Sequence, residues 1–166
     1  MLADRAGHYA ERLRALEGKA EYNVKAAHDE QAVLHHVLAE NPELRALVEA
    51  NRRAGGGSYE QKLHLGEQVT AAVRAREAGD GAEVLRALEP CADSVSVAPE
   101  GTGWLANVSF LVNRDSADGF VAAVEELRRE QPHLELRVHG PLPPYSFVDP
   151  GPARPADDAA SVGRGR

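Results

Sequence analysis

Histidine, cysteine, serine and carboxylate side chains are the groups in this 166-residue chain that would bind a metal or perform catalysis. The chain has seven histidines, but they form neither an H-E-x-x-H motif nor a cysteine/histidine group with the spacing of a zinc site. His35 and His36 are adjacent on an expected helix, so their side chains point in different directions. We interpret all the histidines as surface or half-buried side chains and expect neither a metal site nor a cofactor.

The possible nucleophiles and the paired carboxylates also lack a catalytic arrangement. The serines and the single cysteine, Cys91, lie in no nucleophile-elbow motif. Glu125-Glu126 falls on an expected helix surface and Asp157-Asp158 near the C-terminus, where solubility explains acidic pairs better than acid–base catalysis does. We therefore expect a protein that is not an enzyme.

Charge and hydropathy argue against two further classes of partner. The chain carries a net charge of −7, and its lysines and arginines are scattered among acidic residues. Binding to nucleic acid or to an anionic membrane requires a local excess of basic side chains. No apolar stretch is long enough to span a membrane, and a single cysteine fits a reducing compartment. The composition predicts a soluble, cytoplasmic protein with no nucleic-acid or membrane partner.

The elements that must position these side chains begin with a helix, a strand and a large helical segment. Residues 3–16 have the apolar spacing of a short helix, which we assign to an N-terminal segment, residues 1–17. Residues 20–26 alternate between apolar and polar side chains, as a half-buried strand does. Apolar side chains then recur at helical spacing, which predicts a helical insertion at about residues 29–89.

Capping residues divide this insertion into several helices. Asp29 and Asn41 are each placed to cap a helix, and Ser58 with Gln61 has the spacing of a capping box. Glycine is unfavourable in a helix interior, so we expect Gly79-Asp80-Gly81 to interrupt the last long helix before a short one continues.

The second half of the chain predicts three strands and one helix. Alternating side chains indicate strands at residues 94–98, 104–113 and 134–139. Between the last two strands, Asp115 is placed to cap a helix that extends to residue 131. The order is β-α-β-β-α-β, which is typical of a ferredoxin-like α+β fold with its first helical position expanded into several helices.

A proline-rich arm, residues 140–148 with the sequence GPLPPYSFV, ends the expected domain, residues 18–148. Proline fixes its own φ angle, so this spacing predicts a rigid, extended, polyproline-like path. The arm either lies back across its own sheet as a strap or binds a partner. Residues 149–166 have almost no apolar side chains, and we expect them to be disordered.

Three segments of the chain resemble one protein family. GPLPPYSFV at residues 140–148 is similar to the G-P-W-P-P-Y-S-F motif of the gas vesicle protein F/L family, with Leu142 in place of tryptophan. EYNVK at residues 21–25 and NVSFLV at residues 107–112 resemble that family's E-W-G-V-K and N-V-A-F-L-V strands, in the same order and at comparable spacing. The family's usual N-terminal domain has no counterpart before Met1, so the chain is expected to be a natural short form or a fragment.

The resemblance implies a noncatalytic gas vesicle assembly protein or minor structural protein, located in the cytoplasm and on the vesicle. It would bind the hydrophobic shell protein and other accessory proteins of the vesicle, and a homodimer is a further hypothesis. The competing hypothesis is a small-molecule-binding or enzymatic ferredoxin-like domain, because one fold hosts many activities. A cleft with converging polar groups and shifted pKa values would favour that alternative.

Our candidate residues for anchoring the arm or binding a partner are mostly aromatic, proline and apolar side chains on the expected strands, helices and arm. Two have specific reasons: Trp104 is the only tryptophan, and His139 leads into the arm and could orient it by a hydrogen bond. The full set is Tyr22, Leu47, Trp104, His139, Pro143, Pro144, Tyr145 and Phe147.

Overall fold

The computed structural model describes residues 2–99, 101 and 103–148, and it confirms the α+β class and the β-α-β-β-α-β order that follows an N-terminal helix. The tail that we expected to be disordered, residues 149–166, lies outside the described residues. The helices and strands are α1 (Leu2–Leu16), β1 (Lys19–His28), α2 (Glu30–Glu40), α3 (Pro42–Arg53), α4 (Tyr59–Leu88), β2 (Ser94–Val97), β3 (Ala106–Asn113), α5 (Ala117–Glu130) and β4 (Leu134–Leu142).

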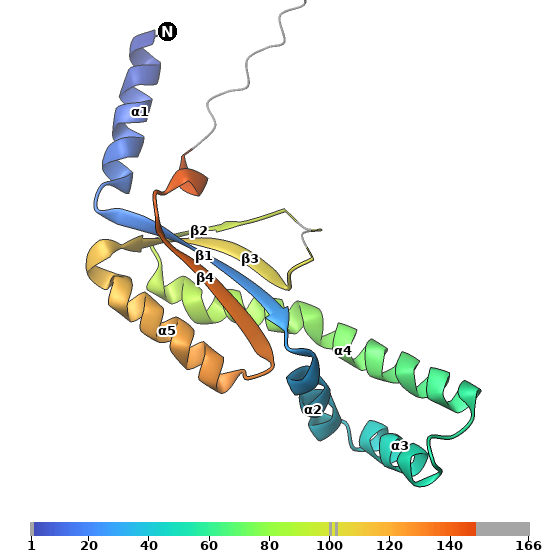
Figure 1. Ribbon diagram of the computed structural model, residues 1–166. Coiled ribbons are helices and arrows are strands. Elements are labelled where there is room, and N and C mark those ends of the chain that lie inside the picture. Colours follow the sequence, from blue (N-terminus) through green and yellow to red (C-terminus); the bar gives the residue numbers. More distant parts are fainter. Residues whose placement is uncertain (1, 100, 102, 149–166) are drawn as a thin grey trace, which may run out of the picture.

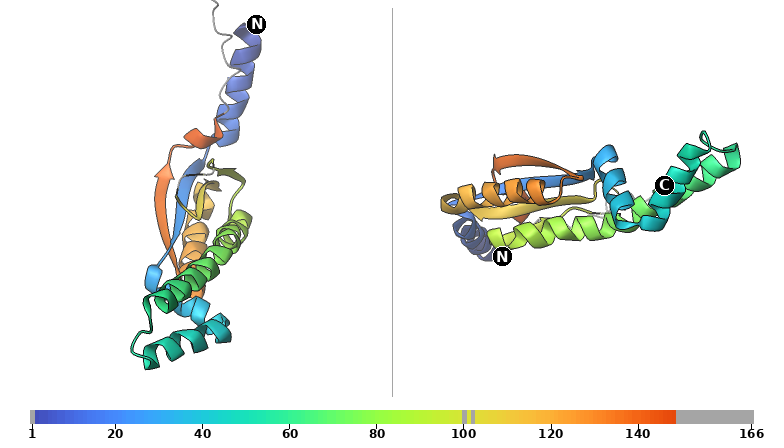
Figure 2. Two further views of the ribbon diagram at one scale, coloured as in Figure 1. Left: turned by 90° about the vertical axis from the view of Figure 1, so that its right-hand side faces the viewer. Right: turned by 90° about the horizontal axis from the view of Figure 1, so that it is seen from below.

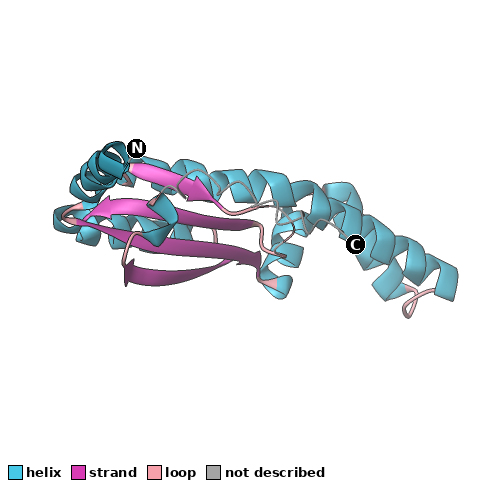
Figure 3. Cartoon of the chain, turned by 90° about the horizontal axis from the view of Figure 1, so that it is seen from above, coloured by secondary structure: helices cyan, strands magenta, loops and turns pink. Residues whose placement is uncertain are grey.

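The four strands form one antiparallel sheet in the order β2-β3-β1-β4. On β1, Val24 lies opposite Val108 of β3 and Val138 of β4, so apolar side chains from three strands share one face. Helix α5 and the C-terminal half of α4 cover this face (Figures 1 and 2). Figure 3, seen from above, shows the sheet in front of these two helices, so its other face points toward the viewer.

The main core lies between the sheet and these two helices. The alternation of β1 places Tyr22 and Val24 in this core, and the Tyr22 ring packs on Phe120 of α5 at a centroid distance of 5.1 Å. Phe120 also packs on Phe110 of β3 at 5.4 Å. Burying side chains of this size contributes about 1.5–3 kcal/mol each, so this aromatic cluster holds α5 to the sheet.

Helix α4 is continuous over 30 residues, so the interruption expected at Gly79-Asp80-Gly81 is wrong. The side chain of Asp80 is buried against His28, and the Gly81 backbone lies directly against the backbone of Leu105. Both tertiary contacts form with a helical backbone at this point. Packing therefore overrides the low intrinsic helix propensity of the two glycines.

Helices α2, α3 and the N-terminal half of α4 project from one end of the sheet (Figure 1). A second, smaller core holds this helical projection together, with Val37 and Leu44 buried against α4. The expected caps are present: Asp29 and Asn41 accept hydrogen bonds at the starts of α2 and α3, and Ser58 with Gln61 forms a capping box on α4.

Helix α1 stands away from the opposite end of the sheet (Figure 1). Its Leu13 side chain is 68% exposed, and Tyr9 is exposed as well. No helix in the described part of the chain combines the length and the apolar character that a membrane span needs. Tyr9 and Leu13 of α1 are therefore left largely uncovered by the described residues of their own chain, whereas Leu16 at its end is partly buried.

Three local expectations need correction. The strand expected from residue 104 begins at Ala106, so Trp104 lies in the preceding loop. Asp115 does not cap α5, because it lies within a short 3₁₀ turn that precedes the helix. The arm is not a continuous polyproline path: β4 continues to Leu142, and a 3₁₀ turn follows at Tyr145–Phe147.

Candidate functional site

Three histidines that are dispersed in the sequence meet around one buried carboxylate. His28 at the end of β1 lies with its Nε2 atom 2.8 Å from Oδ2 of Asp80, and His133 before β4 has its Nε2 atom 3.1 Å from the same oxygen. The ring of His36 on α2 stacks on the His133 ring with centroids 4.3 Å apart. Arg76, one helical turn before Asp80, donates to Oδ1 at 3.2 Å. The cluster joins β1, α2, α4 and the start of β4.

Burial and charge shift two pKa values in this cluster. Burial alone would raise the pKa of Asp80, but contacts with His28 and His133 and the positive charge of Arg76 outweigh it and lower that pKa below its ordinary value. Burial lowers the pKa of His133, and contact with Asp80 offsets this shift only in part. We therefore assign Asp80 as a carboxylate and His133 as a neutral imidazole at neutral pH.

This polar cluster has the features of a structural contact between elements rather than of a reactive site. His133 is only 1% exposed, and Asp80 is buried as well. A cleft of about 330 Å³ lies beside it, lined by Ala75, Arg76, Gly79, Asp80, Glu83 and Gln131. The lining contains no serine, threonine, cysteine, lysine or tyrosine, and both oxygens of Asp80 already have partners. Among the described residues, no group of His, Cys, Asp and Glu side chains is arranged to hold a metal ion.

A second buried carboxylate holds the C-terminal turn on the open face of the sheet, which is the face opposite α4 and α5. Glu21 is 5% exposed although it points away from the helices. Its Oε2 atom accepts a hydrogen bond from the Ser146 backbone N–H at 3.0 Å, and its Oε1 atom accepts one from the Ser146 hydroxyl at 2.5 Å. Gly140 lets the arm pass close by, because a Cβ atom there would lie 2.7 Å from the Tyr22 ring. This geometry matches the strap alternative for the arm.

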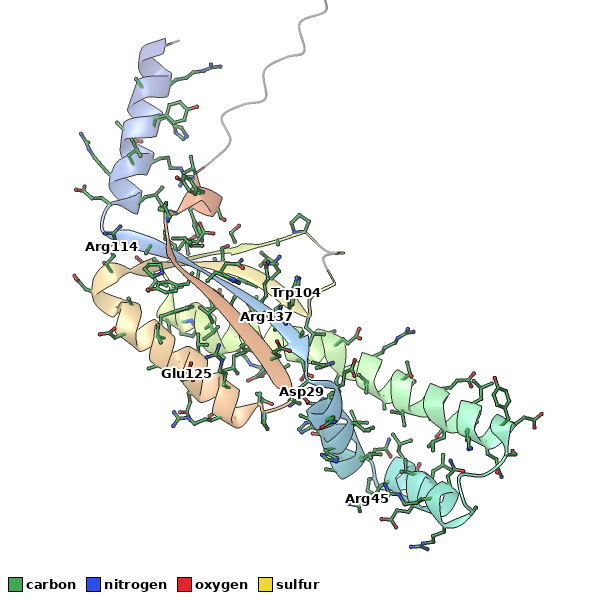
Figure 4. The ribbon with its side chains drawn as sticks, in the orientation of Figure 1. Asp29, Arg45, Trp104, Arg114, Glu125 and Arg137 are labelled. Carbon is green, nitrogen blue, oxygen red and sulfur yellow. The ribbon has the colours of Figure 1, made fainter. Side chains whose placement is uncertain are left out.

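The candidate residues on the rest of the open face do not form a pocket with the turn. Two cations lie near the Trp104 ring: Nζ of Lys25 is 5.6 Å and Cζ of Arg137 is 5.3 Å from its centroid. Figure 4 labels Trp104 and Arg137. His139 is exposed, opposite Asn23 on β1, and within the described residues its side chain has no hydrogen-bond partner. His139 therefore does not orient the arm through a hydrogen bond here.

The turn brings four candidate residues together at the base of α1. Pro143, Pro144, Tyr145 and Phe147 follow β4, and the Tyr145 ring is 79% exposed while Phe147 is half-buried. Tyr145 and Pro144 line a groove with side chains from the end of α1. The remaining core candidate, Tyr22, is 6% exposed, packs on Phe120 and lines a separate hollow with Pro143 and Pro144.

The last candidate, Leu47, lies at the far end of the molecule. It is 37% exposed and lines a small groove of about 180 Å³ between α3 and α4. The other lining residues are Ala50, Asn51, Ala54, Gln61, His64 and Leu65. The helical projection thus carries an apolar groove of its own, separate from the one at the base of α1.

Sequence reasoning missed the polar cluster because its members are up to 105 positions apart, from His28 to His133. One signal was present: a charged residue between two glycines, Asp80, lay within an otherwise helical pattern. The strap was missed in detail because Glu21 reads as an exposed strand residue from alternation alone. The turn at Ser146, which donates two hydrogen bonds to the Glu21 carboxylate, covers this side chain.

Sequence comparison finds clear relatives. A model of the family described as "Gas vesicle synthesis protein GvpL/GvpF" matches residues 1–149. Gas vesicle protein F of Streptomyces sp. (strain CB03234) is 63% identical over 149 residues, which cover 90% of this chain and 63% of the relative. Gas vesicle protein F2 of Halobacterium salinarum is 46% identical over 43 residues, or 26% of this chain and 20% of the relative.

Solved structures show a similar fold. The crystal structure of gas vesicle protein GvpF from Anabaena sp. PCC7120 has a TM-score of 0.61 and 22% identity, covering 90% of this chain and 62% of that one. GvpF from Microcystis aeruginosa has a TM-score of 0.57 and 22% identity, covering 88% and 61%. The chain spans about 63% of the length of its Streptomyces relative. From the match over residues 1–149, the chain belongs to the gas vesicle synthesis protein GvpL/GvpF family.

Proposed function

We propose that this protein is a noncatalytic accessory or minor structural protein of the gas vesicle. In this role it binds the hydrophobic shell protein and other vesicle proteins, in the cytoplasm and on the vesicle. The observation that carries the proposal is the pair of apolar grooves at opposite ends of the molecule, one at the base of α1 and one between α3 and α4. Exposed apolar grooves are the kind of surface that receives a partner's helix or strand.

The chemistry of the described residues supports a binding role over catalysis. The one buried cluster of titratable groups uses both oxygens of Asp80 for internal contacts with His28 and Arg76. Exposed apolar side chains lie at both ends: Leu13, Tyr145 and Val148 at one end, and Leu47 at the other. A binding protein needs such surfaces, and a catalytic one needs a free reactive group.

Coexpression with the gas vesicle shell protein followed by copurification tests the proposal. We compare the wild-type chain with Tyr145→Ala and Leu47→Glu, each checked for folding by circular dichroism and thermal melting. Loss of copurification in one folded variant would establish binding and locate its surface. If the folded wild-type chain copurifies with no vesicle protein, the proposed function is wrong.

A homodimer formed through the exposed helices is part of the same proposal. Helix α1 leaves Tyr9 and Leu13 uncovered by the described residues of its own chain, which favours contact with a second apolar surface. Light scattering across a broad concentration range tests this. A monomer at every concentration would exclude the dimer but not the binding of other vesicle proteins.

A small-molecule-binding role is the second candidate, because the cleft of about 330 Å³ beside Asp80 contains polar groups and a shifted pKa value. Thermal-shift screening of metabolites separates the two candidates. A ligand that stabilises the wild-type protein but not a folded Glu83→Ala variant, which alters the cleft wall, would favour this second function.

A further inference from the structure

We propose that the groove at the base of α1 docks an apolar segment of another vesicle protein, and that a carboxylate on this segment pairs with Arg114. The inference rests on the proposed function and names the surface and the chemistry of the partner. The groove has a volume of about 490 Å³ and is lined by Leu13 and Leu16 of α1, by Pro144, Tyr145 and Val148 of the C-terminal turn, and by basic side chains at its edge.

The apolar part of this surface extends beyond one groove. A second hollow of about 450 Å³ lies on the other side of Arg114 and Pro144, which line both. Its walls include Ala20, Ala117, Pro141, Leu142 and Pro143. Arg114 therefore lies between two apolar hollows, at the level where the strap joins the end of the sheet. A partner that fills both hollows lies against both Arg114 and Pro144.

Charge specifies the partner. Arg14 and Arg114 line the groove, and within the described part of the chain neither guanidinium group has a hydrogen-bond or ion-pair partner. Lys19 also lines it and pairs with Asp93 at 3.0 Å, and the acidic side chain that lines the groove is Glu17. Basic groups therefore exceed acidic ones at this groove in a chain whose net charge is −7. An apolar segment with an aspartate or glutamate in its middle complements this surface.

The strap fixes the geometry of the site. Both hydrogen bonds from Ser146 to Glu21 hold the turn, so Tyr145 stands at the groove wall without being buried itself. A wall that is already ordered loses little conformational entropy when a partner binds. We therefore treat Glu21 and Ser146 as positioning residues of the docking surface.

Site-specific photocrosslinking tests this inference. A benzoylphenylalanine at position 145 of the full chain is irradiated in cells that coexpress the other gas vesicle proteins, and mass spectrometry identifies the linked segment. Arg114→Glu is compared with Arg45→Glu, which makes the same charge change at the far end of the helical projection (Figure 4). We expect crosslink yield to fall about tenfold in Arg114→Glu and to remain unchanged in Arg45→Glu. Replacing the partner's carboxylate by arginine should restore it in Arg114→Glu.

The remaining outcomes are equally decisive. Equal crosslinking in Arg114→Glu and wild type, or crosslinks to a segment without a carboxylate, would overturn the inference. Crosslinks to residues 149–166 of the same chain or to a second copy, with none to another vesicle protein, would also overturn it, because they would show a different occupant. If the wild-type chain still copurifies with vesicle proteins, the proposed function survives such a result. If it does not, both fail.

Discussion

The two glycines within α4 provide a matched pair for testing how packing sets this helix. A Cβ atom added at Gly79 would have no atom within 4 Å, whereas one added at Gly81 would lie 2.4 Å from the carbonyl oxygen of Leu105. Alanine is favoured over glycine in a helix interior by about 0.8–1.0 kcal/mol. The substitutions Gly79→Ala and Gly81→Ala therefore gain the same helix propensity. They differ because only the alanine at position 81 meets the Leu105 carbonyl oxygen.

The magnitude follows from that contact. Gly79→Ala should raise the free energy of unfolding by about 0.5–1 kcal/mol, because nothing opposes the gain in helix propensity. At Gly81 the obstacle is backbone, which cannot rotate away as a side chain can, and overpacking of this kind costs about 1–3 kcal/mol. Gly81→Ala should therefore leave stability unchanged or lower it by up to about 2 kcal/mol.

Urea denaturation monitored by circular dichroism at 222 nm measures both variants against the wild-type protein. Equal m-values would show that the midpoints report stability rather than a change in compactness. The reasoning is refuted if Gly81→Ala stabilises the protein as much as Gly79→Ala does. That result would mean that α4 does not lie against the loop that contains Leu105.

The polar cluster and the strap give further expectations. Asp80→Asn should lower the free energy of unfolding by about 2–4 kcal/mol, because the buried contacts of the carboxylate lose their charge. A loss below about 0.5 kcal/mol in urea denaturation would contradict a structural role for the Asp80 cluster. The pKa of His133 is lowered in the folded state, so the unfolded chain binds its proton first as pH falls below about 6.5. The neutral His133 side chain therefore makes its full contribution to the free energy of unfolding above that pH. Below it, the free energy of unfolding decreases by at most about 1.4 kcal/mol per pH unit. His133→Phe should reduce this slope between pH 5 and 6.5. Denaturation curves measured across this range that give the same slope for the variant and the wild-type protein would argue against a buried neutral imidazole. Glu21→Gln should weaken the attachment of the turn to the sheet by about 1–2 kcal/mol and speed hydrogen exchange of the Ser146 amide. Tyr145→Ala removes an exposed ring and should change the free energy of unfolding by less than about 0.5 kcal/mol. The reverse ranking in hydrogen exchange and melting experiments would show that the ring, rather than the carboxylate, holds the turn.

Local sequence signals predicted much of this fold. The alternation of residues 20–26 is seen in β1, because a strand with one buried face must alternate. Capping residues such as Ser58 marked helix starts correctly, since a cap satisfies backbone N–H groups within a few positions. These signals depend on neighbours in the chain, so a single sequence contains them in full.

The sequence determined the elements, their order and the family resemblance, through periodicity, caps and three ordered motifs. The tertiary structure alone decided which distant groups meet: Asp80 with His28 and His133, and Glu21 with Ser146. It also decided that α4 continues through its glycines. The physical reason is that burial and long-range contacts depend on how the sheet and helices pack, and a packed environment can override local propensity and bring distant polar groups together.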